Sequence, residues 1–174
     1  EDSKEVAQQT QQKKLSERTL RSKKNLPTKR ATILVAVDFS SHSRKALLYA
    51  AQLASDLKRP LQILHVVHDP GESPGYYANK KAKKQLQRLE ERASEMFDEF
   101  LVHTIHKNSS ITPLKKAKQI LVSGLPVTRI LEIEKKLQPY MLVMGSQGKT
   151  KLAHLMLGSK AEQVVQLSTG PITI

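Results

Sequence analysis

A strand, a helix and a second strand follow one another early in the chain, and this order limits the folds open to it. The run TILVAVDF, Thr32 to Phe39, is apolar and β-branched, which is typical of a strand buried on both faces. Apolar residues then recur at helical spacing until Pro60, with Ser40 or Ser41 available to cap the helix. A second run, LQILHVV, spans Leu61 to Val67. Strands joined by one helix run parallel, so the pattern predicts a parallel crossover unit.

The same alternation continues to the last residue. We expect a turn-rich loop at 68–75, a long helix at 78–106, a loop at 107–113, a strand at 117–123, a helix from Pro126 to Pro139, a strand at 140–146, a helix at 159–167 and a strand at 171–174. Five strands alternate with four helices. This pattern predicts an α/β sandwich with a mostly parallel central sheet and right-handed crossovers.

The first thirty residues differ from the rest in composition. They hold nine Lys or Arg and four Asp or Glu, with few apolar residues and no aromatic residue. Such a segment cannot bury enough surface to offset the entropy lost on ordering. We therefore expect residues 1–30 to be a flexible basic arm or a marginal helix, and residues 31–174 to be one domain. The arm is either an anchor for nucleic acid or an acidic membrane, or a solvated tail.

Composition narrows the functional classes further. The chain lacks cysteine, which excludes disulfides and thiolate metal sites. Its longest apolar runs fall far short of the roughly 20 residues of a membrane-spanning helix, and its start has no apolar secretory region. These features predict a soluble, cytoplasmic protein. The net charge of +13 favours anionic partners without choosing among them.

Three of the chain's seven glycines lie in one segment, MGSQGKTKLAHLMLGSKAE, from Met144 to Glu162. Two well-known phosphate-binding patterns fail there. A P-loop needs a glycine five positions before Gly148, where the chain has Val143. The dinucleotide pattern G-x-G-x-x-G fails because the spacing here is G-x2-G-x9-G-S, after the fourth predicted strand.

The actual spacing still has a physical interpretation. Gly145 and Gly148 follow a buried strand, where the absent Cβ atoms allow a sharp turn and close approach to a ligand. Ser159 and Glu162 match the S-x-x-E capping box, which predicts a helix start whose free N–H groups and dipole attract anions. Lys149, Lys151 and Lys160 add positive charge nearby. The alternative is that the glycines serve only a loop and close packing.

Taken together, these segments resemble the universal stress protein family, in its ATP-binding branch. The resemblance covers residues 31–174. It rests on ILVAVDFS with Asp38, LHVV in the second strand, VSGLPVTRI around Gly124, and the G-x2-G-x9-G-(S/T) signature. The last of these is the most specific.

The resemblance implies a Rossmann-like sheet of order 3-2-1-4-5 with helices on both faces, in which Asp38 and Gly145 meet across one crevice. It implies that ATP or another adenine nucleotide binds there, with Mg or Mn as a companion held through the phosphates. The implied adenosine contacts are Ala36, Asp38, Val66 and Met144. The implied phosphate contacts are Gly145, Gly148, Gly158 and Ser159, followed by Lys160 and Ala161. From the residues alone, Asp38 could equally cap the following helix.

Two features depart from the family pattern. Lys160 and Ala161 stand where the family often has a small or β-branched pair whose second member offers a hydroxyl, so a charge is gained and a hydrogen bond is lost. The basic arm has no counterpart in the minimal family domain. By resemblance we also expect a homodimer through the C-terminal strand, Pro171 to Ile174, and a regulatory protein partner that the sequence does not identify.

Three functions therefore stay open at this point. The residues favour a nucleotide-binding regulatory protein, because no nucleophile with a base is visible and the six histidines form no metal-binding spacing. A slow ATPase or self-phosphorylating enzyme is the second alternative. An adaptor that binds nucleic acid or a membrane surface through the arm is the third.

Overall fold

The computed structural model describes residues 31–69, 80–108, 110–148 and 157–174. The predicted arm at 1–30, most of the predicted loop at 68–75, and Lys149 and Lys151 lie outside these residues.

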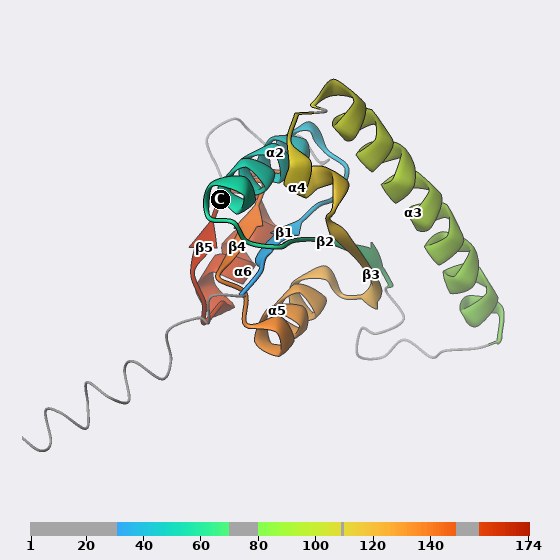
Figure 1. Cartoon of the computed structure of the whole chain (residues 1–174). Helices are drawn as coiled ribbons and strands as arrows, with labels where there is room; N and C mark the ends of the chain where they lie inside the picture. The colour runs from blue at the N-terminus through green and yellow to red at the C-terminus, as the bar shows by residue number, and fades with distance from the viewer. Residues whose placement is uncertain (1–30, 70–79, 109, 149–156) are drawn as a thin grey trace, which may run out of the picture.

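Five strands form one sheet in the order β3-β2-β1-β4-β5, and every neighbouring pair is parallel (Figure 1). The strands are β1 (Ile33–Ala36), β2 (Leu61–His68), β3 (Lys118–Gly124), β4 (Met141–Met144) and β5 (Ile172–Thr173). In the centre, Ile33 pairs with Leu61 on one side and with Met141 on the other. The predicted α/β class and the strand order are confirmed.

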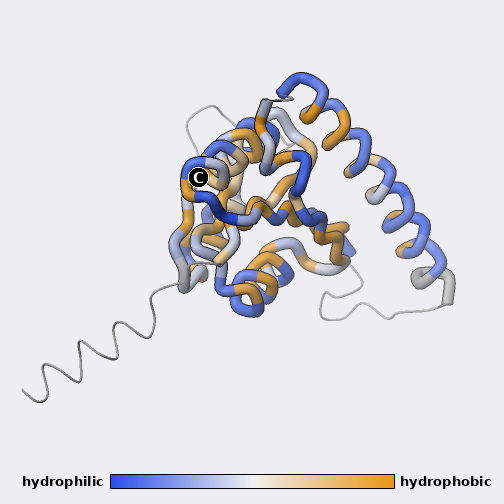
Figure 2. Tube along the Cα trace, in the orientation of Figure 1, coloured by the Kyte–Doolittle hydropathy of each residue, from blue (hydrophilic) through white to orange (hydrophobic). Residues whose placement is uncertain are grey.

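Helices cover both faces of the sheet. Helices α2 (Ser41–Asp56), α3 (Lys80–Lys107) and α4 (Thr112–Lys115) pack on one face, and α5 (Pro126–Leu137) and α6 (Ser159–Leu167) pack on the other. Each face therefore has its own apolar cluster. Because β1 lies between them, all four of its residues are buried, which is why its sequence lacks polar alternation. Figure 2 shows the resulting contrast between the mainly apolar strands and the mainly hydrophilic outer side of α3.

Helix α4 is absent from the sequence prediction, which placed a loop at 107–113. The short helix begins at Thr112 with Pro113 in its first turn, and Leu114 is buried against the core. Proline is compatible with the first turn of a helix, because the N–H it lacks would have no partner there. The predicted loop at 107–113 is therefore wrong at its last two residues, Thr112 and Pro113.

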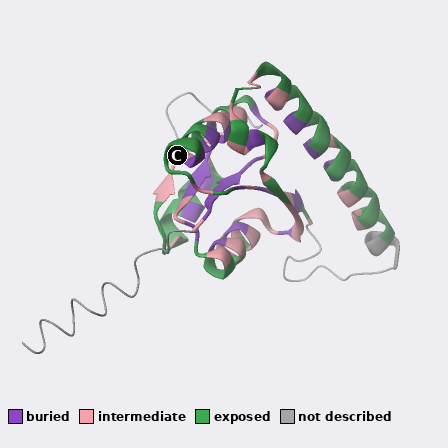
Figure 3. Ribbon diagram, in the orientation of Figure 1, coloured by how far each residue is buried: buried purple, intermediate pink, exposed green. Residues whose placement is uncertain are grey.

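Helix α3 is the longest of the described helices and is only partly packed. From residue 84 onward, its buried side chains begin at Ala93 and continue through Phe97, Phe100, Leu101 and Thr104. Figure 3 shows the exposed outer surface of α3 and the buried positions that face the rest of the molecule. Between residues 84 and 92, Leu89 is half-exposed, at 51%. This part of α3 therefore borders the domain without being covered by it.

None of the helices in the described ranges is long and apolar enough to cross a membrane.

Candidate functional site

The strand order reverses direction between β1 and β4, and the candidate site forms at the carboxyl ends of these two strands. Asp38 follows β1. Its Oδ1 accepts a hydrogen bond from the Ser40 N–H at 3.0 Å. The cap of α2 is Ser40, whose Oγ accepts from the Ser43 N–H at 3.1 Å. Of the two sequence interpretations of Asp38, the helix-cap interpretation is therefore wrong.

The glycines of the signature are explained by close contacts with protein atoms. A Cβ on Gly145 would lie 2.9 Å from the backbone of both His42 and Ser43, at the start of α2. A Cβ on Gly148 would lie 2.9 Å from Oδ2 of Asp38. The loop after β4 thus fits against α2 and against the carboxylate that follows β1. This close fit brings the two strand ends together.

Gly158 closes the same loop from the other end. Its N–H donates to the Ser146 carbonyl at 2.8 Å, and its own carbonyl accepts from the Glu162 N–H at 2.9 Å. Gly158 is therefore the N-cap residue of α6, and no side-chain hydrogen bond caps this helix. The predicted capping box is wrong, because Ser159 is already the first helical residue and its side chain sits one position too late to cap.

These elements surround a cavity of about 710 Å³. All of the residues that the sequence singled out for nucleotide contact line it: Ala36, Asp38, Val66, Met144, Gly145, Gly148, Gly158, Ser159, Lys160 and Ala161. They come from β1, β2, β4 and the start of α6, and they are far apart in the chain. The volume lies within the range of about 300–1,000 Å³ that is usual for small-molecule sites.

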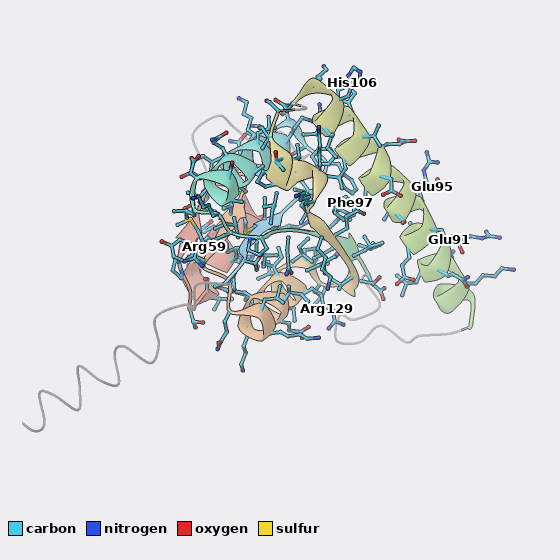
Figure 4. All side chains as sticks on the ribbon, viewed as in Figure 1. Arg59, Glu91, Glu95, Phe97, His106 and Arg129 are labelled. Carbon is cyan, nitrogen blue, oxygen red and sulfur yellow. The ribbon has the colours of Figure 1, made fainter. Side chains whose placement is uncertain are left out.

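Helix α3 supplies a wall that sequence reasoning missed. Leu89, Ala93 and Met96 line the cavity from that side, with Arg92 beside them. In the sequence these residues mark one apolar face of the predicted long helix. Helical spacing identifies such a face but does not say whether a core or a cavity lies opposite. Figure 4 shows Phe97 pointing inward from α3, whereas Glu91 and Glu95 point away.

An aromatic group also borders the cavity. Phe39 has a φ of 64°, unusual for an aromatic residue, and its ring stacks on His65 with centroids 4.0 Å apart. His65 Nδ1 lies 2.7 Å from the Val37 carbonyl oxygen, which holds the imidazole in place. Both side chains line the cavity. The strained backbone at Phe39 turns Asp38 and the start of α2 toward the same opening.

Apolar and polar groups line different parts of the cavity. Apolar side chains from β2, α3 and α5 surround one part, including Val66, Met96 and Ile130. The other part holds the Asp38 carboxylate, the glycine loop and the amino terminus of α6, where Lys160 is exposed. A flat apolar group and an anionic group joined together would match both parts. Among the described side chains, no group of three or more His, Cys, Asp or Glu is placed to hold a metal ion.

The fold and the site define a doubly wound α/β protein with its crevice at the reversal of strand order. The chain belongs to the universal stress protein family, whose sequence profile matches residues 29–174.

Individual relatives agree with this assignment. Universal stress protein YxiE of Bacillus subtilis is 31% identical over 155 residues, which cover 82% of this chain and 96% of that protein. The structure of universal stress protein UspA from Lactobacillus plantarum is similar, with a TM-score of 0.66 and 21% identity over 83% of this chain and 97% of that one. A universal stress protein in complex with cAMP has a TM-score of 0.53 and 21% identity, covering 84% of this chain and 97% of that one.

Proposed function

We propose that this chain is a regulatory nucleotide-binding protein that holds an adenine nucleotide, ATP in the first instance, in the cavity at the carboxyl ends of β1 and β4. The observation that carries the proposal is the convergence of ten residues, chosen from sequence alone, on one cavity. A universal stress protein of the same fold has been crystallised with cAMP, which supports an adenine nucleotide as the ligand class.

The two ends of the cavity suggest the orientation of the ligand. Adenosine lies against the apolar part, in contact with Ala36, Val66 and Met144, and reaches Asp38 where that part meets the glycine loop. The phosphates lie at the glycine loop and the start of α6, where backbone N–H groups and the helix dipole favour negative charge. Mg²⁺ or Mn²⁺, when bound, is held through the phosphates.

Isothermal titration of the full chain with ATP, ADP, AMP and adenosine tests this proposal. We expect each of them to bind and the affinity to rise with the number of phosphates. Acid extraction of the purified protein followed by mass spectrometry should release an adenine nucleotide if one is retained during purification. Failure of all four ligands to bind to a folded, nucleotide-free protein would overturn the proposal.

Lys160 provides a sharper test, because its charge departs from the family pattern. In Lys160→Val we expect the affinity for ATP to fall about two- to fivefold, since an exposed charge contributes modestly. The affinity for adenosine should not change. Lys136→Val removes another exposed lysine, from α5, and is the matched control. Unchanged ATP affinity in Lys160→Val would show that Lys160 does not contact the phosphates.

The free side of β5 supports a proposal about assembly. Among the described strands, β5 pairs only with β4, and Tyr49 and Ile174 beside it are 51% and 41% exposed. Unpaired strand edges tend to recruit another strand. We propose a homodimer through Pro171 to Ile174, which light scattering at micromolar concentration would reveal as twice the monomer mass. A monomeric mass under those conditions would contradict it.

A further inference from the structure

The side of the sheet where the strands begin, opposite the cavity, carries an excess of positive charge. All five strands run in one direction, so their amino-terminal ends lie together. Helices α2, α4 and α5 end at this edge, since each leads directly into the next strand. Seven basic residues lie at these helix ends and at the start of β3, and we call them the basic edge: Lys58, Arg59, Lys115, Lys116, Lys118, Lys135 and Lys136.

Contacts across the sheet keep this edge together. The Arg59 guanidinium lies over the Tyr140 ring, 3.9 Å from its centroid, and so joins the end of α2 to the start of β4. Gln62 of β2 pairs with Lys118 of β3. Arg59 Nη1 also donates to the Ala31 carbonyl at 3.0 Å. The basic arm is thus covalently joined to the domain at this same edge.

The positive charge is concentrated at the basic edge, and few acidic residues balance it there. Residues 31–174 hold twenty basic and twelve acidic residues, a net charge of +8. The seven basic residues of the basic edge have two acidic neighbours, Asp56 and Glu134. Together these nine residues carry a net charge of +5, which is more than half of the total. Glu134 is buried and accepts hydrogen bonds from Ser168 and Gly170. Within the described part of the chain, none of the six lysines forms an ion pair or a side-chain hydrogen bond.

Helix dipoles explain only part of this arrangement. Lys135 and Lys136 lie in the last turn of α5, where a positive charge is favourable. Lys58 and Lys116 lie at or just beyond the ends of α2 and α4, and Lys118 lies in β3. Asp56 is the exposed acidic residue beside them, so most of their mutual repulsion is not compensated within the described residues. A polyanion lying across the edge would remove that repulsion.

We propose that the basic edge binds the phosphate backbone of double-stranded nucleic acid without regard to sequence. From β3 to β4 the edge spans three strand spacings, roughly 14 Å. Over that length a duplex presents roughly eight phosphate charges. A protein surface meets only the phosphates on the facing side of the duplex, so seven basic side chains are enough to neutralise them. Lysine suits this role because it is a point charge with no fixed pairing geometry.

Two other polyanions fit the edge less well. Single-stranded nucleic acid is usually bound by stacking of bases on aromatic rings, but the ring of Tyr140 at this edge is covered by Arg59. Stable attachment to a membrane needs apolar insertion or a lipid chain besides basic residues. In the described residues of this edge, the large exposed apolar side chains are Leu57 and Leu167, at the ends of two separate helices. These observations favour the duplex.

Fluorescence anisotropy with a labelled 20-base-pair DNA duplex of arbitrary sequence tests the proposal in the full chain. The test variant is Lys115→Gln with Lys116→Gln, and the control variant is Lys45→Gln with Lys84→Gln. All four lysines are exposed, so both double variants should fold, and both keep the arm and the same net charge. We expect the test variant to lose about tenfold or more in affinity at low salt and to reduce the salt slope by about two. The control should change affinity less than about threefold.

Three results would overturn the proposal. The full chain could fail to bind the duplex at 50 mM salt. Both double variants could lose affinity equally, which would indicate a diffuse field. Vesicles that contain phosphatidylserine could outcompete the duplex, with the test variant weakening only vesicle binding, which would identify a membrane surface as the partner.

Discussion

At the scale of single residues, the glycines of the signature are distinguished by what lies opposite their missing Cβ atoms. Gly145 faces the backbone of His42 and Ser43, whereas Gly148 faces the end of the Asp38 side chain. A backbone cannot move aside without shifting α2, but a carboxylate can rotate. The same substitution should therefore have different consequences at the two positions.

We predict that Gly145→Ala lowers the free energy of unfolding by about 1–3 kcal/mol, because the added methyl group overpacks the start of α2. Gly148→Ala should change stability by less than about 1 kcal/mol but should weaken ATP binding, since it displaces Asp38. Urea unfolding and isothermal titration of both variants separate these effects. Equal stability losses would mean that the Asp38 side chain is held as firmly as the backbone.

The buried carboxylate of Glu134 offers a second residue-scale prediction. Glu134 is 5% exposed, and its Oε1 accepts from the Ser168 Oγ at 2.6 Å and from the Gly170 N–H at 3.2 Å. Glu134→Ala removes the acceptor of both hydrogen bonds, although Ser168 and Gly170 also bond to each other at 3.3 Å, and it should reduce the free energy of unfolding by about 1–2 kcal/mol. Glu134→Gln keeps an acceptor oxygen and should lose less.

Glu132→Ala on the same helix is the control for this prediction. Its ion pair with Arg129 is 2.7 Å long, but the glutamate side chain is 54% exposed, so the loss should stay below about 1 kcal/mol. Chemical unfolding of the three variants gives the comparison. A loss in Glu132→Ala as large as that in Glu134→Ala would refute the role assigned to burial.

At the scale of elements, the sequence predicted the helices and strands whose bounds depend on a few neighbouring residues. The five strands, a serine cap of α2 at Ser40 or Ser41 and the start of α5 at Pro126 could be predicted, because apolar runs, a capping serine and a first-turn proline act over a few residues. The structure selects Ser40 as the cap. The predicted helix at 159–167 matches α6, but its cap could not be predicted. Ser159 and Glu162 match a capping box, whereas the N-cap residue is Gly158, whose N–H donates to the Ser146 carbonyl outside the helix.

The candidate site likewise contains residues that could be predicted from the sequence and residues that could not. Residues that belong to a signature, such as Asp38 and Gly145, could be placed at the site from sequence. The wall formed by Leu89 and Met96 could not, because helical spacing shows that a face is apolar without showing what lies opposite. Phe39 carries no sequence signal for its positive φ.

Helix α3 is the element whose position we expect to be easiest to change. Before Ala93 it buries little surface, and a hydrogen bond from the Ser123 hydroxyl to the Glu90 carboxylate ties these turns to β3. Ser123→Ala should therefore raise amide hydrogen exchange several-fold in α3 residues 84–92, with no change after Ala93. Ser94→Ala, at an exposed position of α3, is the control. Unaltered exchange in Ser123→Ala would show that packing alone holds these turns.

At the scale of the whole molecule, the two proposed binding surfaces lie at opposite ends of the strands of one sheet. The cavity is at the carboxyl ends of the strands, and the basic edge is at their amino ends. Although both ligands are anions, they should bind together. We predict that saturating ATP changes the affinity for the DNA duplex by less than about threefold in anisotropy titrations at constant ionic strength. Displacement of the duplex by ATP would indicate a shared site.

The position of β1 also matters while the chain is being made. Among the five described strands β1 is synthesised first, yet it becomes the centre of the sheet, and its neighbour β4 follows roughly a hundred residues later. At typical rates of translation, that interval is roughly 5–20 seconds. During this time one side of a fully apolar strand has no partner on the ribosome. The growing chain, rather than the finished protein, is therefore the form most exposed to aggregation and most dependent on chaperones.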